Sequence, residues 1–334
     1  MRSIFFNNTP KQIPYVYAPE TMELLKEIAG LETETIYSGE YVLAHPDDFQ
    51  DVDFLFSTWG MPKMTEEDIK KIFPKVQCVF YGAGSVQAFA RPYLNCGIKI
   101  FSAWGANAVP VAEYCLGQIL LANTGYFHTF GAMSSGKPMD AHSIKFKFPG
   151  NYDVPVGIIG VGMIGELTIK LLKQFKIDIW AYSRSLTEEK AAKLGVRKST
   201  IEEIFANCQV VSNHLANLPA TVGMLKKEHF ASMIPYATFI NTGRGAQIVE
   251  EDMIEVLKER PDLFAVLDVT HPEPPVEGSP LYELPNVIIT PHIAGSLGNE
   301  VHRMAEYMAN EFKHYINNEP CEYEVSMEML EKMA

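Results

Sequence analysis

The glycine-rich segment at residues 156–165, VGIIGVGMIG, constrains the fold more than any other part of this sequence. With a buried strand before it and a helix after it, Gly160 would form the tight turn and Gly165 would let helix and strand pack closely. Gly162 would let the backbone approach a pyrophosphate, which the free amide groups of the helix N-terminus would hold. The pattern therefore predicts a dinucleotide-binding Rossmann unit, and a glycine-rich turn with a packing role alone is the alternative. The contacts predicted from it are those of Gly160, Gly162, Met163, Ile164 and Gly165.

Ser183 and Arg184 stand at the end of the next expected strand, a position that contacts the adenosine ribose in Rossmann folds. An acidic residue there would bond both ribose hydroxyls of NAD. Ser183 carries no charge, and the guanidinium of Arg184 can bond a 2′-phosphate. We therefore expect NADP or NAD as the cofactor, with NADPH slightly favoured; an exposed Arg184 that contacts nothing is the alternative.

Short β-branched and aromatic runs alternate with amphipathic helical stretches along the chain, which is typical of an α/β fold. A polar stretch at 131–150 interrupts this alternation and is expected to connect a helix to a loop. The expected strands are 3–6, 33–37, 53–57, 77–82 and 98–103, then 155–159, 177–183, 209–212, 237–241, 263–269 and 286–290, and the longest expected helices are 109–123 and 299–316.

The last expected helix has apolar residues at helical spacing after the second series of strands is complete. It is therefore expected to return to the first series. We predict two domains: a substrate domain formed by residues 1–104 and 298–334, and an inserted dinucleotide-binding domain formed by residues 105–297.

Composition excludes several classes of protein. The 334-residue chain has a formal net charge of -13 and no run of Lys and Arg, which argues against nucleic-acid binding. Its five cysteines form no C-x-x-C pair, which favours reduced thiols in a cytoplasmic protein over disulfides or zinc. No apolar run is long enough to span a membrane, and His302 with Glu306 lacks a third ligand, so we expect neither membrane insertion nor a metal.

Three segments that follow expected strands carry the residue types of an acid–base site: NTGRG at 241–245, LDVTHPEP at 267–274 and TPHIAG at 290–295. Ligands of an open α/β sheet bind outside the carboxyl ends of its strands. The segments offer Arg244 for an anion, Glu273 as an acidic partner and His292 as a proton carrier. Hydride transfer to a carbonyl creates an alkoxide, which an imidazolium can protonate and an arginine can stabilise.

Six segments of the chain carry a resemblance to a known family: GIKIFSAWGANAVPVAEYCLGQILLA, GIIGVGMIG, VVSNHLANLPAT, FINTGRG, LDVTHPEP and TPHIAG. With these segments the chain resembles the D-isomer-specific 2-hydroxyacid dehydrogenases. The resemblance implies a flavodoxin-like substrate domain and an inserted Rossmann domain. It also implies that Arg244 binds the substrate carboxylate, that His292 is the general acid and base, and that Glu273 bonds His292. A carboxylate beside an imidazole favours its protonated form.

Further roles come from the same resemblance. Asp268 would hold the nicotinamide carboxamide, with Thr242 and Gly295 also at the cofactor. Tyr81, Ala83 and Gly84 of the other domain, with Asn107 nearby, would line the carboxylate side of the substrate. Trp59 and Trp104 follow expected strands of that domain and are expected to favour a bulky substituent on the substrate, although both could instead merely pack their loops.

We therefore expect hydride transfer between NAD(P)H and C2 of a small 2-oxo or 2-hydroxy acid, as in glyoxylate and hydroxypyruvate reductases. Glu273 argues against the formate dehydrogenase branch, in which the matching residue is a glutamine. The alternative is a non-catalytic nucleotide-sensing or partner-binding protein on the same fold. The apolar helix at 109–123 and its neighbours resemble the dimer surface of the family, so a homodimer is expected.

Overall fold

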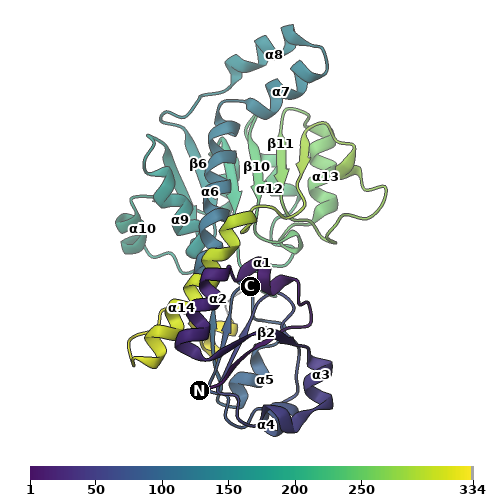
Figure 1. Cartoon of the computed structure of the whole chain (residues 1–334). Helices are drawn as coiled ribbons and strands as arrows, with labels where there is room; N and C mark the ends of the chain where they lie inside the picture. Colours follow the sequence, from purple (N-terminus) through teal and green to yellow (C-terminus); the bar gives the residue numbers. More distant parts are fainter. Residues whose placement is uncertain (332–334) are drawn as a thin grey trace. The chain divides into compact units, whose positions relative to one another are not determined.

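The computed structural model describes residues 1–331, which form two compact units. The first unit contains residues 1–107 and 296–331 of the described chain, and the second contains residues 108–295. Each unit is built on its own sheet, and Figure 1 shows helices packed around both. The α/β class and the Rossmann unit predicted from the sequence are confirmed.

The sheet of the first unit has the strand order β13-β5-β4-β3-β1-β2. All neighbours are parallel except β13, which pairs antiparallel with β5. Its strands are β1 (Ser3–Phe6), β2 (Leu31–Tyr37), β3 (Phe54–Ser57), β4 (Cys78–Tyr81), β5 (Lys99–Ser102) and β13 (Glu324–Val325). Its helices are α1 (Gln12–Val16), α2 (Pro19–Ala29), α3 (Gly39–Ala44), α4 (Glu66–Ile72), α5 (Ala90–Asn95), α14 (His302–Ile316) and α15 (Met327–Leu330), with the short turns η1 (Pro46–Phe49) and η5 (Gly298–Val301).

Aromatic side chains form the centre of the first core. Phe56, Phe80 and Phe101 lie side by side on neighbouring strands, with ring centroids 5.1 Å and 4.9 Å apart. Phe312 of α14 packs against Phe80 at 5.4 Å, so the last long helix covers the sheet that the first residues of the chain begin. Offset and edge-to-face aromatic pairs of this kind add stability beyond the area that they bury.

The sheet of the second unit has the order β12-β11-β10-β9-β6-β7-β8, and every neighbouring pair is parallel. The order reverses between β6 and β9, and this is the point at which a Rossmann sheet binds a dinucleotide. Its strands are β6 (Pro155–Ile159), β7 (Asp178–Tyr182), β8 (Arg197–Lys198), β9 (Val210–Asn213), β10 (Thr238–Asn241), β11 (Phe264–Leu267) and β12 (Val287–Ile289).

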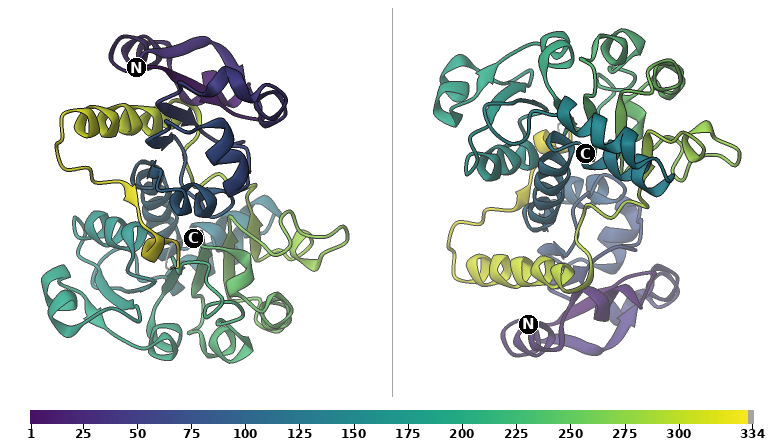
Figure 2. Two further views of the ribbon diagram at one scale, coloured as in Figure 1. Left: turned by 90° about the horizontal axis from the view of Figure 1, so that it is seen from below. Right: turned by 90° about the horizontal axis from the view of Figure 1, so that it is seen from above.

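Helices of the second unit cover this sheet, and in both views of Figure 2 the yellow-green segment between β11 and β12 extends away from it as a long loop. The helices are α6 (Trp104–Asn123), which begins in the first unit, α7 (Tyr126–Ser134), α8 (Pro138–Ile144), α9 (Met163–Leu172), α10 (Glu188–Leu194), α11 (Ile201–Asn207), α12 (Lys227–Ser232) and α13 (Glu250–Glu259), with the short turns η2 (Lys145–Lys147), η3 (Gly245–Gln247) and η4 (Pro280–Tyr282).

Two sequence predictions about this unit were wrong. The helix expected from residue 109 begins at Trp104, because it runs on through Pro110 and buries Ala106 and Val111 on either side of it. The proline removes one backbone hydrogen bond without ending the helix. The stretch expected to lead into a loop at 131–150 forms the end of α7, then α8 and η2, because Pro138 occupies the first turn of α8, where its missing amide costs nothing.

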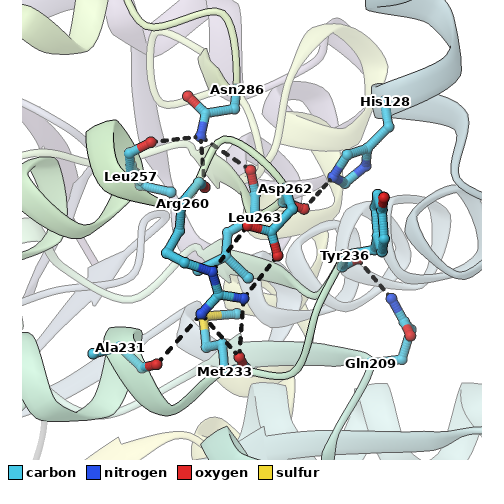
Figure 3. A network of polar contacts seen from close by, with 10 residues as sticks. All are labelled: His128, Gln209, Ala231, Met233, Tyr236, Leu257, Arg260, Asp262, Leu263 and Asn286. Carbon is cyan, nitrogen blue, oxygen red and sulfur yellow. Dashed lines mark hydrogen bonds and ion pairs between the residues drawn. The ribbon is translucent and has the colours of Figure 1, made fainter. Parts of the chain in front are cut away.

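A polar network closes the amino end of the second sheet, the end opposite to the candidate site (Figure 3). Arg260 forms a two-point ion pair with Asp262 at 2.9 Å and 2.7 Å, and the carbonyl oxygen of Asp262 lies 2.9 Å from Nε2 of His128 on α7. Burial lowers the pKa of His128, and this favours the neutral ring. The network connects α7 to the start of β11.

Within residues 1–331, no helix is long and apolar enough to cross a membrane.

Candidate cofactor and catalytic site

The glycine loop after β6 has the local geometry that a dinucleotide requires. Gly160 has a φ of +97°, and a Cβ there would lie 2.5 Å from the carbonyl oxygen of His214. A Cβ at Gly165 would overlap the carbonyl oxygen of Gly160. Gly162, in contrast, is the N-cap residue of α9, and a Cβ there would meet no protein atom within 4 Å. The first and last glycines are thus required by packing, whereas the middle one keeps open space beside a helix N-terminus, where an anion binds well.

The end of β7 places Ser183 half-buried and Arg184 exposed. Oγ of Ser183 lies 3.3 Å from Oγ of Ser185. Arg184 has no ion pair with an acidic side chain among the described residues. Its guanidinium is therefore available to an anion near the ribose position.

Arg244 follows β10 and is half-buried, and its Nη1 donates to the carbonyl oxygen of Gly243 at 2.7 Å. Within residues 1–331 it has no carboxylate partner, so its remaining donors can bind an external anion. Gly245 lies so close to the loop after β11 that a Cβ would overlap the backbone of Thr270. This contact packs the Arg244 turn against the segment that carries Glu273.

The imidazole of His292 is paired with the carboxylate of Glu273: Nδ1 lies 2.7 Å from Oε1. Both side chains are partly exposed, at 45% and 41%. Because Glu273 binds Nδ1, the other ring nitrogen, Nε2, is left to face a substrate. His292 has a left-handed backbone with a φ of +57°, which a non-glycine residue rarely adopts.

Asp268, directly after β11, organises the loop that carries His292. It is 2% exposed, and its Oδ1 accepts hydrogen bonds from Oγ1 of Thr290 at 2.6 Å and from the amide of Ile293 at 2.8 Å. Its Oδ2 accepts from the amide of Ala294 at 2.9 Å. The backbone amide of His292 donates to the carbonyl oxygen of Asp268 at 3.1 Å. These contacts use most of the acceptor capacity of one carboxylate and leave one position on Oδ2.

A buried polar chain lies beneath the cofactor loops. Sγ of Cys115 on α6 is 3.2 Å from Oγ1 of Thr242, and Oγ of Ser212 is 2.9 Å from Nε2 of His214. Burial lowers the pKa of His214 to about 4, so its ring is neutral near pH 7. Sequence reasoning missed the contact of Cys115, because nothing near it in the chain marks that helix face as facing β10.

The substrate-binding candidates from the other half of the sequence lie at the carboxyl edge of the first sheet. Ser102 donates to the carbonyl oxygens of Ala83 at 2.9 Å and Gly84 at 2.6 Å, which holds this turn. Oδ1 of Asn107 accepts from the amide of Ser296 at 3.0 Å. Trp104 packs edge-on against Tyr323, 5.2 Å between centroids. Tyr81 is buried and ends β4, and Trp59 is partly buried after β3.

The second unit brings together Arg244, Asp268 and His292 because their strands are neighbours. β10 pairs with β11 and β11 with β12, in register at Asn241, Leu267 and Ile289. The candidate residues thus follow three adjacent carboxyl ends of one parallel sheet. Among the described residues, no three His, Cys, Asp or Glu side chains are grouped closely enough to hold a metal ion.

Comparison with known proteins finds a family profile that matches residues within the second unit. The profile of the D-isomer specific 2-hydroxyacid dehydrogenase, NAD binding domain, matches residues 132–294. Formate dehydrogenase of Neurospora crassa is 30% identical over 260 residues, which cover 75% of this chain and 69% of that protein. The chain belongs to the D-isomer specific 2-hydroxyacid dehydrogenase family.

The chain aligns with less than two thirds of the length of the first curated relatives that it matches. YoaD of Bacillus subtilis is 34% identical over 206 residues, or 60% of this chain, and the match spans only 58% of YoaD. A phosphoglycerate oxidoreductase from Rhizobium etli has a similar structure, with a TM-score of 0.80 over 98% of this chain and 99% of that one. At 18% sequence identity, that likeness shows a shared fold alone.

Proposed function

We propose that the chain is an oxidoreductase that transfers a hydride between NAD(P)H and C2 of a small 2-oxo or 2-hydroxy acid. The observation that carries this proposal is the 2.7 Å pair of His292 and Glu273, at the same sheet edge as an arginine without a carboxylate partner among the described residues. In a family of NAD-binding dehydrogenases, this combination supplies a proton carrier and an anion clamp.

Each residue has a chemical task in this proposal. When bound, the dinucleotide would supply the hydride for reduction and take it up in oxidation. Nε2 of His292 gives a proton to the oxygen on C2 in reduction and removes it in oxidation, while Glu273 holds Nδ1. Arg244 binds the carboxylate of the acid with its planar guanidinium and stabilises negative charge on the C2 oxygen. Glu273 also distinguishes the chain from formate chemistry, which requires no proton transfer.

The cofactor would be held by residues whose geometry suits it. Open space at Gly162 and the free amides of α9, which begins with Met163 and Ile164, fit a pyrophosphate. Thr242 follows β10, which pairs with the strand that Asp268 follows, and Gly295 follows Ala294, whose amide binds Asp268. Oδ2 of Asp268 has one acceptor position for a carboxamide. We further propose that Tyr81, Ala83, Gly84 and Asn107 contact the substrate carboxylate and that Trp59 and Trp104 contact its C3 substituent.

A substrate panel tests the proposal. Initial rates with glyoxylate, hydroxypyruvate, pyruvate and bulkier 2-oxo acids, each with NADH and NADPH, should show turnover of at least one acid and no oxidation of formate. Dinucleotide binding without turnover of any acid would contradict the enzymatic proposal and favour a nucleotide-sensing protein. Equal kcat/KM for small and bulky acids would remove Trp59 and Trp104 from substrate selection.

We propose a preference for NADPH over NADH, because Ser183 has no charge to repel a 2′-phosphate and Arg184 is exposed beside it. One charge-assisted hydrogen bond corresponds to a preference of about ten- to a hundredfold. Ser183→Asp should reverse the preference, since a carboxylate accepts from the ribose diol and repels a phosphate. Arg184→Ala should raise KM for NADPH and leave KM for NADH nearly unchanged.

The matched control for Arg184 is Arg197→Ala, because Arg197 stacks on Trp180 with its Cζ 3.8 Å from the ring centroid and has no role in this proposal. KM for both cofactors should stay unchanged in that variant. A parent protein that uses NADH at least as well as NADPH, with no effect of Arg184→Ala, would contradict the NADPH preference.

We also propose that the chain forms a homodimer through α7, α8 and η2. Four large apolar side chains there are more than half exposed: Phe130, Met133, Met139 and Phe146. Contiguous exposed apolar surface is uncommon in monomers and marks contact surfaces. Phe130→Glu combined with Phe146→Glu should shift the sedimentation coefficient from dimer to monomer, whereas Val222→Glu, at another exposed apolar residue, should not. A monomeric parent protein would contradict the proposal.

A further inference from the structure

Tyr114 lies on α6 and is joined by hydrogen bonds to the loop that carries His292. Its hydroxyl oxygen is 3.3 Å from Oγ1 of Thr290, and Oγ1 of Thr290 is 2.6 Å from Oδ1 of Asp268. Tyr114 is 176 residues before Thr290 in the chain, so this link depends on the fold.

The direction of the two hydrogen bonds follows from counting protons. A threonine hydroxyl has one proton to donate, and the ionised Asp268 can only accept. Thr290 therefore donates to Asp268, and Tyr114 must donate to Thr290. Burial raises the pKa of Tyr114, so its hydroxyl keeps the proton that it donates. The result is a directed chain from α6 to the carboxylate that binds the amides of Ile293 and Ala294.

The ring of Tyr114 makes a second connection. It packs in a small apolar cluster, separate from the three larger cores, formed with Val111, Cys115, Ile164 and Ala294. Ile164 belongs to the first turn of α9 after the glycine loop, and Ala294 is two residues after His292. The ring of Tyr114 thus packs against the cluster that includes Ala294 of the proposed proton-transfer loop and that Ile164 also packs against, while its hydroxyl extends to Thr290.

The loop needs such support because of its backbone. The left-handed conformation of His292 is unfavourable for a residue with a Cβ. This conformation is held by hydrogen bonds from the backbone amide of His292 to the carbonyl oxygens of Asp268 and Thr290, at 3.1 Å and 2.9 Å. It is also held by the three hydrogen bonds that the Asp268 carboxylate accepts. Four of these five bonds involve Asp268, and Tyr114 holds the Thr290 hydroxyl in the orientation that bonds its carboxylate.

We propose that Tyr114 is a positioning residue that holds the 290–294 loop, and with it His292, in the arrangement used for proton transfer. The effect on catalysis rests on the proposed function, whereas the effect on the loop does not. Thr290 is the one hydrogen-bonding partner that the Tyr114 hydroxyl has within residues 1–331. Removing only the hydroxyl therefore isolates this role from the packing of the ring.

The test compares Tyr114→Phe with Tyr37→Phe, which removes a hydroxyl bonded to Glu32 at 2.8 Å in the other unit. Loss of one neutral hydrogen bond corresponds to an effect of about two- to twelvefold. In Tyr114→Phe, kcat for 2-oxo acid reduction should fall by that factor, and amide hydrogen exchange in peptides covering 290–297 should accelerate by the same factor. Neither change should occur in Tyr37→Phe. KM for the dinucleotide should stay nearly unchanged, because removing the hydroxyl leaves the ring in its apolar cluster, which Ile164 also packs against.

Variants of Thr290 extend the test. Thr290→Val should reproduce the faster exchange, and adding Tyr114→Phe to it should have little further effect, because both act on one chain of bonds. Thr290→Ser keeps the hydroxyl and should restore slow exchange. If exchange in 290–297 is unchanged in a folded Tyr114→Phe protein, or if the losses in the double variant simply add, the positioning role is wrong. Faster exchange with no turnover of any acid by the parent would uphold that role and contradict the proposed function instead.

Discussion

Replacing His292 by alanine should lower kcat for 2-oxo acid reduction by about 10²–10⁴-fold, the usual contribution of a positioned acid or base. The imidazole acts on the oxygen at C2 and not on the dinucleotide, so the dissociation constant of NADPH should stay nearly unchanged. Stopped-flow or steady-state rates, with cofactor binding followed by fluorescence titration, measure both quantities. His271→Ala is the matched control, because His271 is exposed on the loop that also carries Glu273.

Glu273→Gln provides an independent check of the same pair. The 2.7 Å contact with Nδ1 of His292 would persist as a neutral hydrogen bond, but the imidazolium would lose its anionic partner. The carboxylate would no longer balance the charge of the ring, so kcat for reduction should fall while the dissociation constant of NADPH stays nearly unchanged. Activity of His292→Ala within a few-fold of the parent would exclude His292 as the acid, and an unchanged kcat in Glu273→Gln would exclude Glu273 as its partner.

Replacing Arg244 by lysine should lower kcat/KM for 2-oxo acids by about 10²–10³-fold, comparable with the loss of one donor to a developing oxyanion. Lysine keeps the charge but lacks the planar guanidinium that can form two hydrogen bonds to a carboxylate, so the change is not conservative. The turn itself should stay intact, because Asn241 and Gln247 hold it through the carbonyl oxygen and amide of Arg244. Initial rates across the substrate panel measure the effect.

The control for this variant is Arg260→Lys. Arg260 pairs with Asp262 at the amino end of the same sheet, so its replacement should lower thermal stability and leave kcat/KM unchanged (Figure 3). If Arg244→Lys instead weakens dinucleotide binding and leaves turnover intact, Arg244 belongs to the cofactor site, and its proposed role in binding the substrate carboxylate is wrong.

Local sequence patterns predicted the α/β class and the Rossmann unit. The three glycines, the alternating strand and helix signals and the segments after β10, β11 and β12 each depend on residues close together in the chain. A parallel sheet places the carboxyl ends of its strands along one edge, so the order of strands and motifs in the chain was enough to assign Arg244 and His292 to one region. The family comparison then confirmed the resemblance carried by those motifs.

Local patterns were misleading where packing decides the outcome. The apolar stretch predicted a helix from residue 109, yet α6 begins at Trp104, because burial on both sides of Pro110 outweighs one missing hydrogen bond. The polar stretch at 131–150 suggested a loop, yet Gly131 and Ser134 lie within α7, and only residues 135–137 separate α7 from α8. Helical signals in short segments are weak, and tertiary contacts such as the His128 bond to Asp262 decide between the alternatives.

From the sequence alone came the residues of the candidate site: the glycine loop, Arg244, Glu273 and His292, each marked by neighbours in its own motif. Only the tertiary structure showed that Asp268 binds the His292 loop through both carboxylate oxygens, and that the Tyr114 hydroxyl lies 3.3 Å from Thr290, 176 residues away in the chain. The physical reason is that a hydrogen bond depends on where two groups meet in space. Strand order and helix packing bring these groups together, and no local pattern in α6 records which loop its tyrosine will meet.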